Sequence, residues 1–115
     1  MSKERAKGTR GENGHLKLLR IPFPEAERSG SNHYTPWGPA DFINTGTFAI
    51  EAKNWSDPYK AIRRGWPQAT SNAKKVDLEP ILLVTMPHKR ASEGLFVVRE
   101  EMGIRLLARY VEGVD

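Results

Sequence analysis

The seven residues P-I-L-L-V-T-M at positions 80–86 place apolar side chains on both faces of any strand that they form. A strand of this kind has to be covered on both sides, which is typical of a strand inside a parallel or mixed sheet. Residues 47–53, T-F-A-I-E-A-K, alternate between apolar and polar side chains and predict a second strand. A helix is predicted between these strands, so the chain returns to the same sheet by a crossover. The sequence therefore predicts an α/β fold, with a small central mixed sheet flanked by helices on both faces.

The first part of the chain predicts a short helix followed by a hairpin. Residues 11–20 have apolar side chains at helical spacing, and two prolines shortly afterwards end the helix. Residues 40–43 and 47–53 predict the two arms of the hairpin, which residues 44–46 connect. Gly46 occupies the last place of this loop and suits the left-handed conformation that a three-residue loop requires there.

The region between the two central strands carries a helix start signal. Asp57 can cap the helix and Pro58 suits its first position, so the helix is expected to run to residue 74 or 75. Gly65 and Pro67 lie inside this span and predict a kink or two helical pieces.

The last quarter of the chain predicts a strand over residues 95–99 and then a C-terminal helix. Ile104, Leu107 and Val111 recur at helical spacing. Such an apolar stripe usually faces the core of its own domain. An interface between two copies of the chain is the alternative.

Length and composition bound the class of protein. A chain of 115 residues with 38% hydrophobic and 28% charged residues fits one globular domain, here residues 11–115, preceded by a basic arm at residues 1–10. No apolar run is long enough to span a bilayer, and no signal peptide is visible. The chain has no cysteine, which excludes disulfides and thiolate metal sites. We expect a cytoplasmic protein.

The net charge of +4 favours a polyanionic partner, of which nucleic acid is the commonest. Basic side chains gather in the N-terminal arm and along the predicted central helix, and Lys89 and Arg90 lie in a predicted loop. For the arm, a basic tail without a specific partner is the alternative. The residues expected to contact nucleic acid are Arg5, Lys7, Arg10, Arg63, Arg64, Lys74 and Lys75.

Asp41, Glu51 and Lys53 are brought together by the register of the predicted hairpin. With residues 44–46 as the loop, Glu51 is the diagonal neighbour of Asp41 on one face, and Lys53 continues that face. A loop at residues 45–47 would place the two acids directly opposite each other, whereas a two-residue loop would put Asp41 on the other face. Two close carboxylates repel each other, and a divalent cation relieves the repulsion. A cation held there, beside a lysine, provides what phosphodiester hydrolysis needs.

Asp41, followed by the triplet E-A-K at residues 51–53, resembles the motif of the PD-(D/E)xK nuclease superfamily. An acidic helix before the motif and W-P-Q-A at residues 66–69 after it are similar to the small Holliday junction resolvases of archaea and phages. The resemblance covers about residues 5–85. It implies a restriction-endonuclease-like core and an endonuclease that uses Mg²⁺ or Mn²⁺ and acts as a homodimer on branched DNA, in recombination and repair. By position it implies catalytic roles for Glu12, Asp41, Glu51, Lys53 and Gln68, and metal binding by Asp41, Glu51, the backbone carbonyl of Ala52 and, as a support or second site, Glu12.

Each of these residues also has an ordinary structural interpretation. Glu51 and Lys53 alone would form a solvated strand end. The helix dipole alone would favour Glu12, and Gln68 would fit a helix surface. Trp55, directly after the motif, is expected at the edge of the core or, alternatively, stacked on a base. The alternative functions are a non-catalytic basic domain that binds nucleic acid, a nicking, flap or restriction nuclease of the same fold, and an adaptor between proteins.

Overall fold

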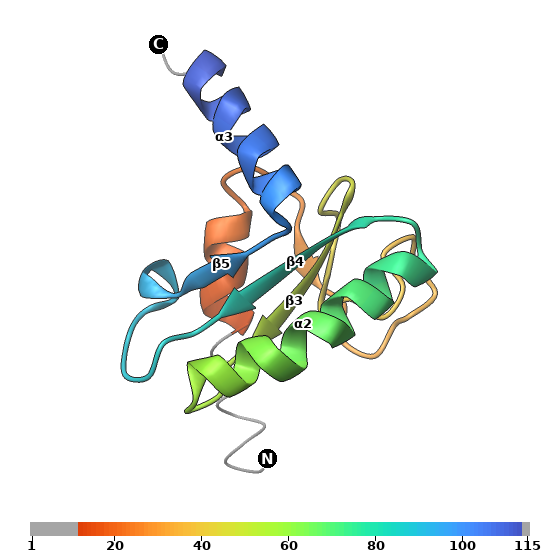
Figure 1. Ribbon diagram of the computed structural model, residues 1–115. Coiled ribbons are helices and arrows are strands. Elements are labelled where there is room, and N and C mark those ends of the chain that lie inside the picture. The colour runs from red at the N-terminus through yellow and green to blue at the C-terminus, as the bar shows by residue number, and fades with distance from the viewer. Residues whose placement is uncertain (1–11, 114–115) are drawn as a thin grey trace.

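Two small sheets, a short helix at the start of the described chain and two longer helices make up the α/β fold (Figure 1). The computed structural model describes residues 12–113. In this part of the chain, no helix is long and apolar enough to cross a membrane. In chain order the elements are the N-terminal helix (residues 12–19), β1 (Glu27–Arg28), β2 (Phe42–Ile43), β3 (Phe48–Lys53), α2 (Pro58–Lys75), β4 (Glu79–Val84), the short 3-10 helix η1 (Ala91–Glu93), β5 (Leu95–Val97) and α3 (Glu100–Gly113).

β4 is the middle strand of the larger sheet, whose order is β3-β4-β5. β3 pairs with β4 in the parallel direction, with Ile50 opposite Ile81, and β5 pairs with β4 in the antiparallel direction. α2 connects the two parallel strands (Figure 1). The mixed sheet and the crossover that the sequence predicted are therefore confirmed.

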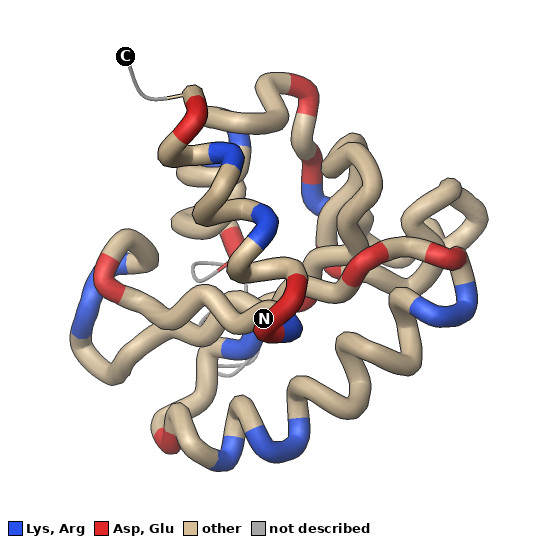
Figure 2. The backbone as a smooth tube through the Cα atoms, turned by 45° about the horizontal axis from the view of Figure 1, so that its top comes forward, with Lys and Arg blue, Asp and Glu red and all other residues tan. Residues whose placement is uncertain are grey.

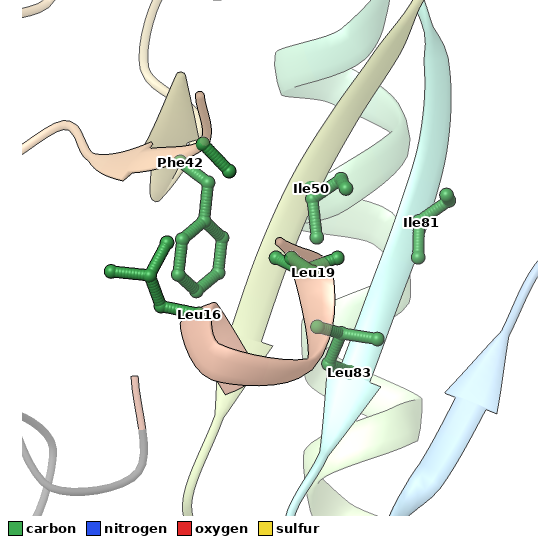
Figure 3. Close-up of a cluster of buried hydrophobic side chains, with 7 residues drawn as sticks. Leu16, Leu19, Phe42, Ile50, Ile81 and Leu83 are labelled. Atoms are coloured by element: carbon green, nitrogen blue, oxygen red, sulfur yellow. The ribbon is translucent and has the colours of Figure 1, made fainter. Parts of the chain in front are cut away.

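The two faces of β4 are covered by different helices. On one face, Ile81 and Leu83 pack in a cluster with two leucines of the N-terminal helix (Figure 3). On the other face, Leu82 and Val84 pack against alanines of α2. Every residue of the strand after its first is buried. The central strand is thus apolar on both sides because each side faces a helix.

The hairpin predicted over residues 40–53 is wrong in its pairing. β2 pairs with β1 in a separate two-stranded sheet, and a backbone bond of 3.1 Å from the Asp41 N–H to the Ile50 carbonyl joins this segment to β3. The next donor on the same edge of β3, the Ala52 N–H, bonds the Asp41 side chain at 2.8 Å. Because a side chain takes the place of a backbone acceptor, the ladder does not continue. Gly46 is left-handed as predicted, with φ of 61°, but Asn44 is left-handed as well, with φ of 62°, and a hydrogen bond of 3.2 Å from the Phe48 N–H to the Thr45 carbonyl closes the turn, so the connection is not the predicted three-residue loop.

α2 is one helix over its whole length, so of the two predicted alternatives, a kink or two helical pieces, the division into two pieces is wrong. Its start is as predicted: the Asp57 side chain accepts a hydrogen bond from the Lys60 N–H at 3.2 Å, and proline occupies the first helical position. Pro67 lies on the exposed side of the helix. Water can therefore bond to the carbonyl that the missing N–H of Pro67 leaves unpaired, and the helix continues through it.

Gly65 lies on the opposite side of α2, against the sheet. A Cβ added there would lie 3.3 Å from the side chain of Leu82 and 3.1 Å from Cγ of Lys53. Both contacts are tighter than ordinary van der Waals packing. The glycine predicted to interrupt the helix therefore lets α2 approach β3 and β4 closely.

The prediction that the apolar stripe of α3 faces the core is wrong. Within the described chain, none of the residues of α3 is buried. Ile104, Leu107 and Val111 are 61%, 57% and 68% exposed. The helix extends away from both sheets (Figure 1). It is held at its base by Arg99, whose guanidinium donates two hydrogen bonds of 2.6 and 2.7 Å to the Glu79 carboxylate.

Candidate active site

Glu51 is the buried acid of the motif, with 2% of its surface exposed. It lies on the face of β3 that is turned towards α2, where Asn72 donates a hydrogen bond from Nδ2 to its Oε1 at 2.7 Å. A buried carboxyl needs such a partner because it has lost its hydration. A solvated strand end, the ordinary interpretation of this residue, therefore does not describe Glu51.

Asp41 meets Glu51 from the segment that precedes β2. Its Oδ2 accepts the bond from the Ala52 N–H, which fixes the carboxyl beside β3. The two carboxyls share a side-chain hydrogen bond. The predicted proximity of the two acids is thus confirmed, although the pairing that produces it differs from a regular hairpin.

The environment of Glu51 strongly favours its protonated form. Burial raises its pKa most, the negative charge and hydrogen bond of Asp41 raise it further, and together they bring it to about 8. The hydrogen bond from Asn72 and the positive charge of Lys53 act in the opposite direction and are outweighed. Without a cation, Glu51 is therefore mostly protonated at neutral pH.

Lys53 ends the same face of β3. Its stem packs against Gly65 of α2, and its Nζ lies 5.7 Å from the centre of the Trp55 ring. The ammonium is close enough to the carboxyl pair to oppose the rise in the pKa of Glu51. The three motif residues are therefore grouped at the end of one strand.

Glu12 approaches the pair from the N-terminal helix. Burial raises its pKa first and the charge of Asp41 second, whereas Arg28 lowers it. Arg28 donates a hydrogen bond to Glu12 at 3.2 Å from β1. Its Nε is buried and has no hydrogen-bond partner among the described residues. Sequence reasoning missed Arg28, and nothing in its local pattern marked it, because the contact depends on the pairing of β1 with β2.

On α2, the side chain that reaches the acids is Asn72, which the sequence did not single out. Gln68 lies one turn earlier and is exposed, so its expected supporting role stays a prediction. Asn72 continues the buried side of the helix, which runs through Ala61, Gly65 and Ala69. A polar residue in line with three small ones was the signal that could have identified it.

The basic residues predicted to contact DNA fall into two groups. Arg5, Lys7 and Arg10 lie outside the described residues. Lys and Arg positions recur along α2 (Figure 2). Those predicted to bind nucleic acid, all exposed, are Arg63, Arg64, Lys74 and Lys75.

The possible metal ligands form a pair with a third donor from the backbone. Within residues 12–113, no group of three or more His, Cys, Asp or Glu side chains could hold a metal ion, so Glu12 does not complete such a group. Ala52 directs its N–H to Asp41, and its carbonyl points to the same edge of β3. Two repelling carboxyls and a carbonyl are the oxygen donors that Mg²⁺ takes, with waters completing its shell. The donor set therefore fits a divalent cation.

Fold and site together define an α/β protein with a pair of close carboxyls, of which Glu51 is buried, and a lysine at the end of a central strand. Comparison with protein-family models, curated proteins and solved structures finds no significant match to this chain.

Proposed function

We propose that this chain is a metal-dependent DNA endonuclease with a restriction-endonuclease-like core, which hydrolyses phosphodiester bonds with Mg²⁺ or Mn²⁺. The observation that carries the proposal is the hydrogen-bonded Asp41–Glu51 pair beside Lys53. Placing a buried acid against a second acid is unfavourable for folding, because each charged form raises the energy of the other. A cation bound between the two acids would offset this cost, whereas nothing in the fold itself requires the acids to be close.

Each residue of the proposed site has a distinct role. The Ala52 N–H orients Asp41, and Asn72 orients Glu51, so that one oxygen of each carboxyl is left to face a cation. A bound Mg²⁺ would supply an activated water and stabilise the negative charge of the transition state. Lys53 contributes a positive charge where the scissile phosphate would lie, and it helps to orient the attacking water.

Affinity for DNA comes from the exposed basic residues. Arg63 and Arg64 lie near the middle of α2, and Lys74 and Lys75 form its last turn. Contacts from such side chains to phosphates position a protein on DNA without reading its sequence. The proposed place of action is the cytoplasm.

The partner proposed for α3 is a second copy of the chain, and the preferred substrate is branched DNA. Two copies packed about a two-fold axis bring the same face of α3 in each copy together. This packing also covers the exposed apolar face of α3, which consists of Ile104, Leu107, Tyr110 and Val111. A homodimer carries two sites, as paired cuts across a four-way junction require.

A magnesium titration with labelled DNA tests the proposal. The purified chain is incubated with a four-way junction and with a linear duplex of matched length. Cleavage is followed as the Mg²⁺ concentration is raised from zero to about 10 mM. We expect cleavage that depends on the cation and is faster on the junction. Cleavage of single strands or flaps would leave a nicking or flap nuclease of the same fold.

The second candidate function is a basic domain that binds nucleic acid without cutting it. It is favoured by the observation that the described residues contain no group of three side-chain metal ligands. Under this alternative, the same titration would show tight binding of DNA and no cleavage at any concentration of Mg²⁺ or Mn²⁺.

A further inference from the structure

A cavity of about 460 Å³ lies where β3 and β4 end. Its walls come from residues 54–56, which follow β3, from residues 85–91, which follow β4, and from Gly14 of the N-terminal helix. The region beyond the carboxyl ends of adjacent parallel strands is where α/β folds commonly bind ligands. The volume falls in the range of sites for one small molecule.

The lining of this cavity is basic and contains an aromatic ring. His88, Lys89 and Arg90 come from the loop after β4, and Trp55, which is 36% exposed, comes from the loop after β3. None of the lining residues, all of which lie in the described part of the chain, is acidic. Ser56 and Thr85 add hydroxyl groups. A ligand that combines an anion with a flat ring matches this surface.

Two residues of the cavity wall lie close in sequence to residues of the candidate site. Trp55 follows Lys53 by two residues, and the lysine Nζ lies 5.7 Å from the centre of its ring. Gly14 follows Glu12 by two residues on the N-terminal helix. A group bound in the cavity is therefore a near neighbour of a phosphate held beside Lys53.

We propose that this cavity binds one unpaired nucleotide of a DNA strand, next to the phosphodiester bond that is cut. The base stacks on Trp55, and the phosphate pairs with Lys89 and Arg90. A space of this size holds one nucleotide, whereas a base pair would have to be opened to enter it. The position of the cut rests on the proposed nuclease function, but the binding of an unpaired nucleotide does not.

The test compares the binding of two labelled DNAs in EDTA, where no cleavage can occur. One is a blunt duplex, and the other is the same duplex with a four-nucleotide unpaired tail. Fluorescence anisotropy with the full chain should show about thirtyfold tighter binding of the tailed DNA, the middle of the range for stacking a base on an aromatic ring. Trp55→Ala should remove this preference and leave the affinity for the blunt duplex unchanged, and Trp55→Phe should keep part of it. The matched control is Tyr34→Ala, which removes a fully exposed aromatic ring outside the cavity.

The charges of the cavity wall give a second, independent readout. The double substitution Lys89→Ala, Arg90→Ala should weaken the binding of the tailed DNA more than that of the blunt duplex, and should reduce the salt dependence of the tailed complex only. Thermal unfolding of each variant shows whether it is folded.

Equal affinity of the folded wild type for the two DNAs would overturn the inference. So would a Trp55→Ala variant that loses the two affinities equally. These outcomes are separate from the failure of the proposed function. A protein that prefers the tail but never cuts DNA keeps the nucleotide site and loses the nuclease proposal, and a protein that cuts without a tail preference does the reverse.

Discussion

α2 and α3 both carry apolar side chains along one face, yet they use that face in opposite ways. The stripe of α2 consists of small residues, including Ala61, Gly65 and Ala69, and packs closely on the sheet. The stripe of α3 consists of large residues and is exposed. Small residues let a helix approach a sheet closely enough to enclose a carboxyl between them. Large ones on α3 leave an exposed apolar face, for which we propose a second copy of the chain as the partner.

The largest expected effect comes from replacing Glu51, which α2 encloses, or Asp41, which lies beside it. Asp41→Asn or Glu51→Gln should lower Mg²⁺-dependent cleavage by about a thousandfold, which corresponds to the several kcal/mol that a bound metal supplies. DNA binding should change little, because phosphate contacts supply most of the affinity. Glu51→Gln keeps the hydrogen bond from Asn72, and without a cation it replaces a side chain that is already mostly neutral at pH 7, so its unfolding temperature in EDTA should stay close to that of the wild type.

The control for these variants is Glu25→Gln, which neutralises an exposed carboxylate. It should cleave at the wild-type rate. A near wild-type rate for Asp41→Asn or Glu51→Gln would instead remove that residue from the proposed site.

Truncating one leucine that α2 covers and one leucine on the exposed face of α3 should change the free energy of unfolding by very different amounts. Leu82→Ala removes a fully buried side chain under α2 and should lower the free energy of unfolding by about 2–5 kcal/mol. Leu107→Ala on α3 should change it by less than about 0.5 kcal/mol. Urea unfolding at submicromolar concentration, where self-association is weakest, measures both. Losses of equal size would mean that α3 is packed within the single chain.

Lys53→Ala tests whether the lysine contributes to the rate of cleavage or only to the affinity for DNA. The cleavage rate should fall by about a hundredfold while the affinity for DNA falls by less than about threefold, because the lysine acts mainly on charge that develops in the transition state. Single-turnover cleavage and anisotropy binding separate the two quantities. Lys17→Ala, on the exposed side of the N-terminal helix, is the control. Proportional losses in rate and affinity would identify Lys53 as a simple phosphate contact.

A charge placed in the middle of the exposed face of α3 tests whether this face forms a dimer interface. Sedimentation at micromolar concentration should show a dimer for the wild type, and Leu107→Asp should weaken dimerisation by at least about tenfold, since it buries a charge without a partner. The variant should keep the unfolding behaviour of the isolated chain. A wild type that is strictly monomeric with and without DNA would defeat the paired-cut proposal and leave a nicking or flap nuclease.

The smallest expected effect is on the pH dependence of the free energy of unfolding, and it comes from His15 in the helix on the other side of the sheet. His15 is buried, with its Nε2 3.0 Å from Thr85 Oγ1, and burial lowers its pKa below the ordinary 6.5. The unfolded chain therefore takes up a proton on His15 before the folded protein does, and the free energy of unfolding falls as pH drops below about 6.5. His15→Gln should lose less stability than the wild type between pH 7 and pH 5 in urea unfolding. The acids contribute equally to both proteins, so identical pH dependences would contradict a buried neutral His15.

Much of the core was predictable from local pattern. The apolar run of β4 and the alternation of β3 define which faces are buried, and the Asp57–Pro58 signal marks the start of α2. These are properties of one element and its period. The meeting of Asp41 with Glu51 was also predictable, because few residues separate them and the turn at Gly46 brings the chain back.

The parts that were not predictable depend on contacts between distant segments. β2 pairs with β1, and this pairing brings Arg28 to Glu12. The choice of Asn72 over Gln68 depends on the rotation of α2 about its axis, which the small residues of its stripe determine. The apolar period of α3 predicts a helix correctly, but a period does not say which molecule covers it.

Gly65 should tolerate no substitution, although it has no functional group that could take part in the reaction. Any side chain at this position would press on the stem of Lys53 and on Leu82 together. The same substitution would therefore loosen the fold and displace the lysine, two effects that elsewhere in the chain belong to separate residues. Sequence variation should thus be as restricted at this backbone position as at the acids themselves, and a comparison of natural variants would rank it among the essential residues although it offers no functional group.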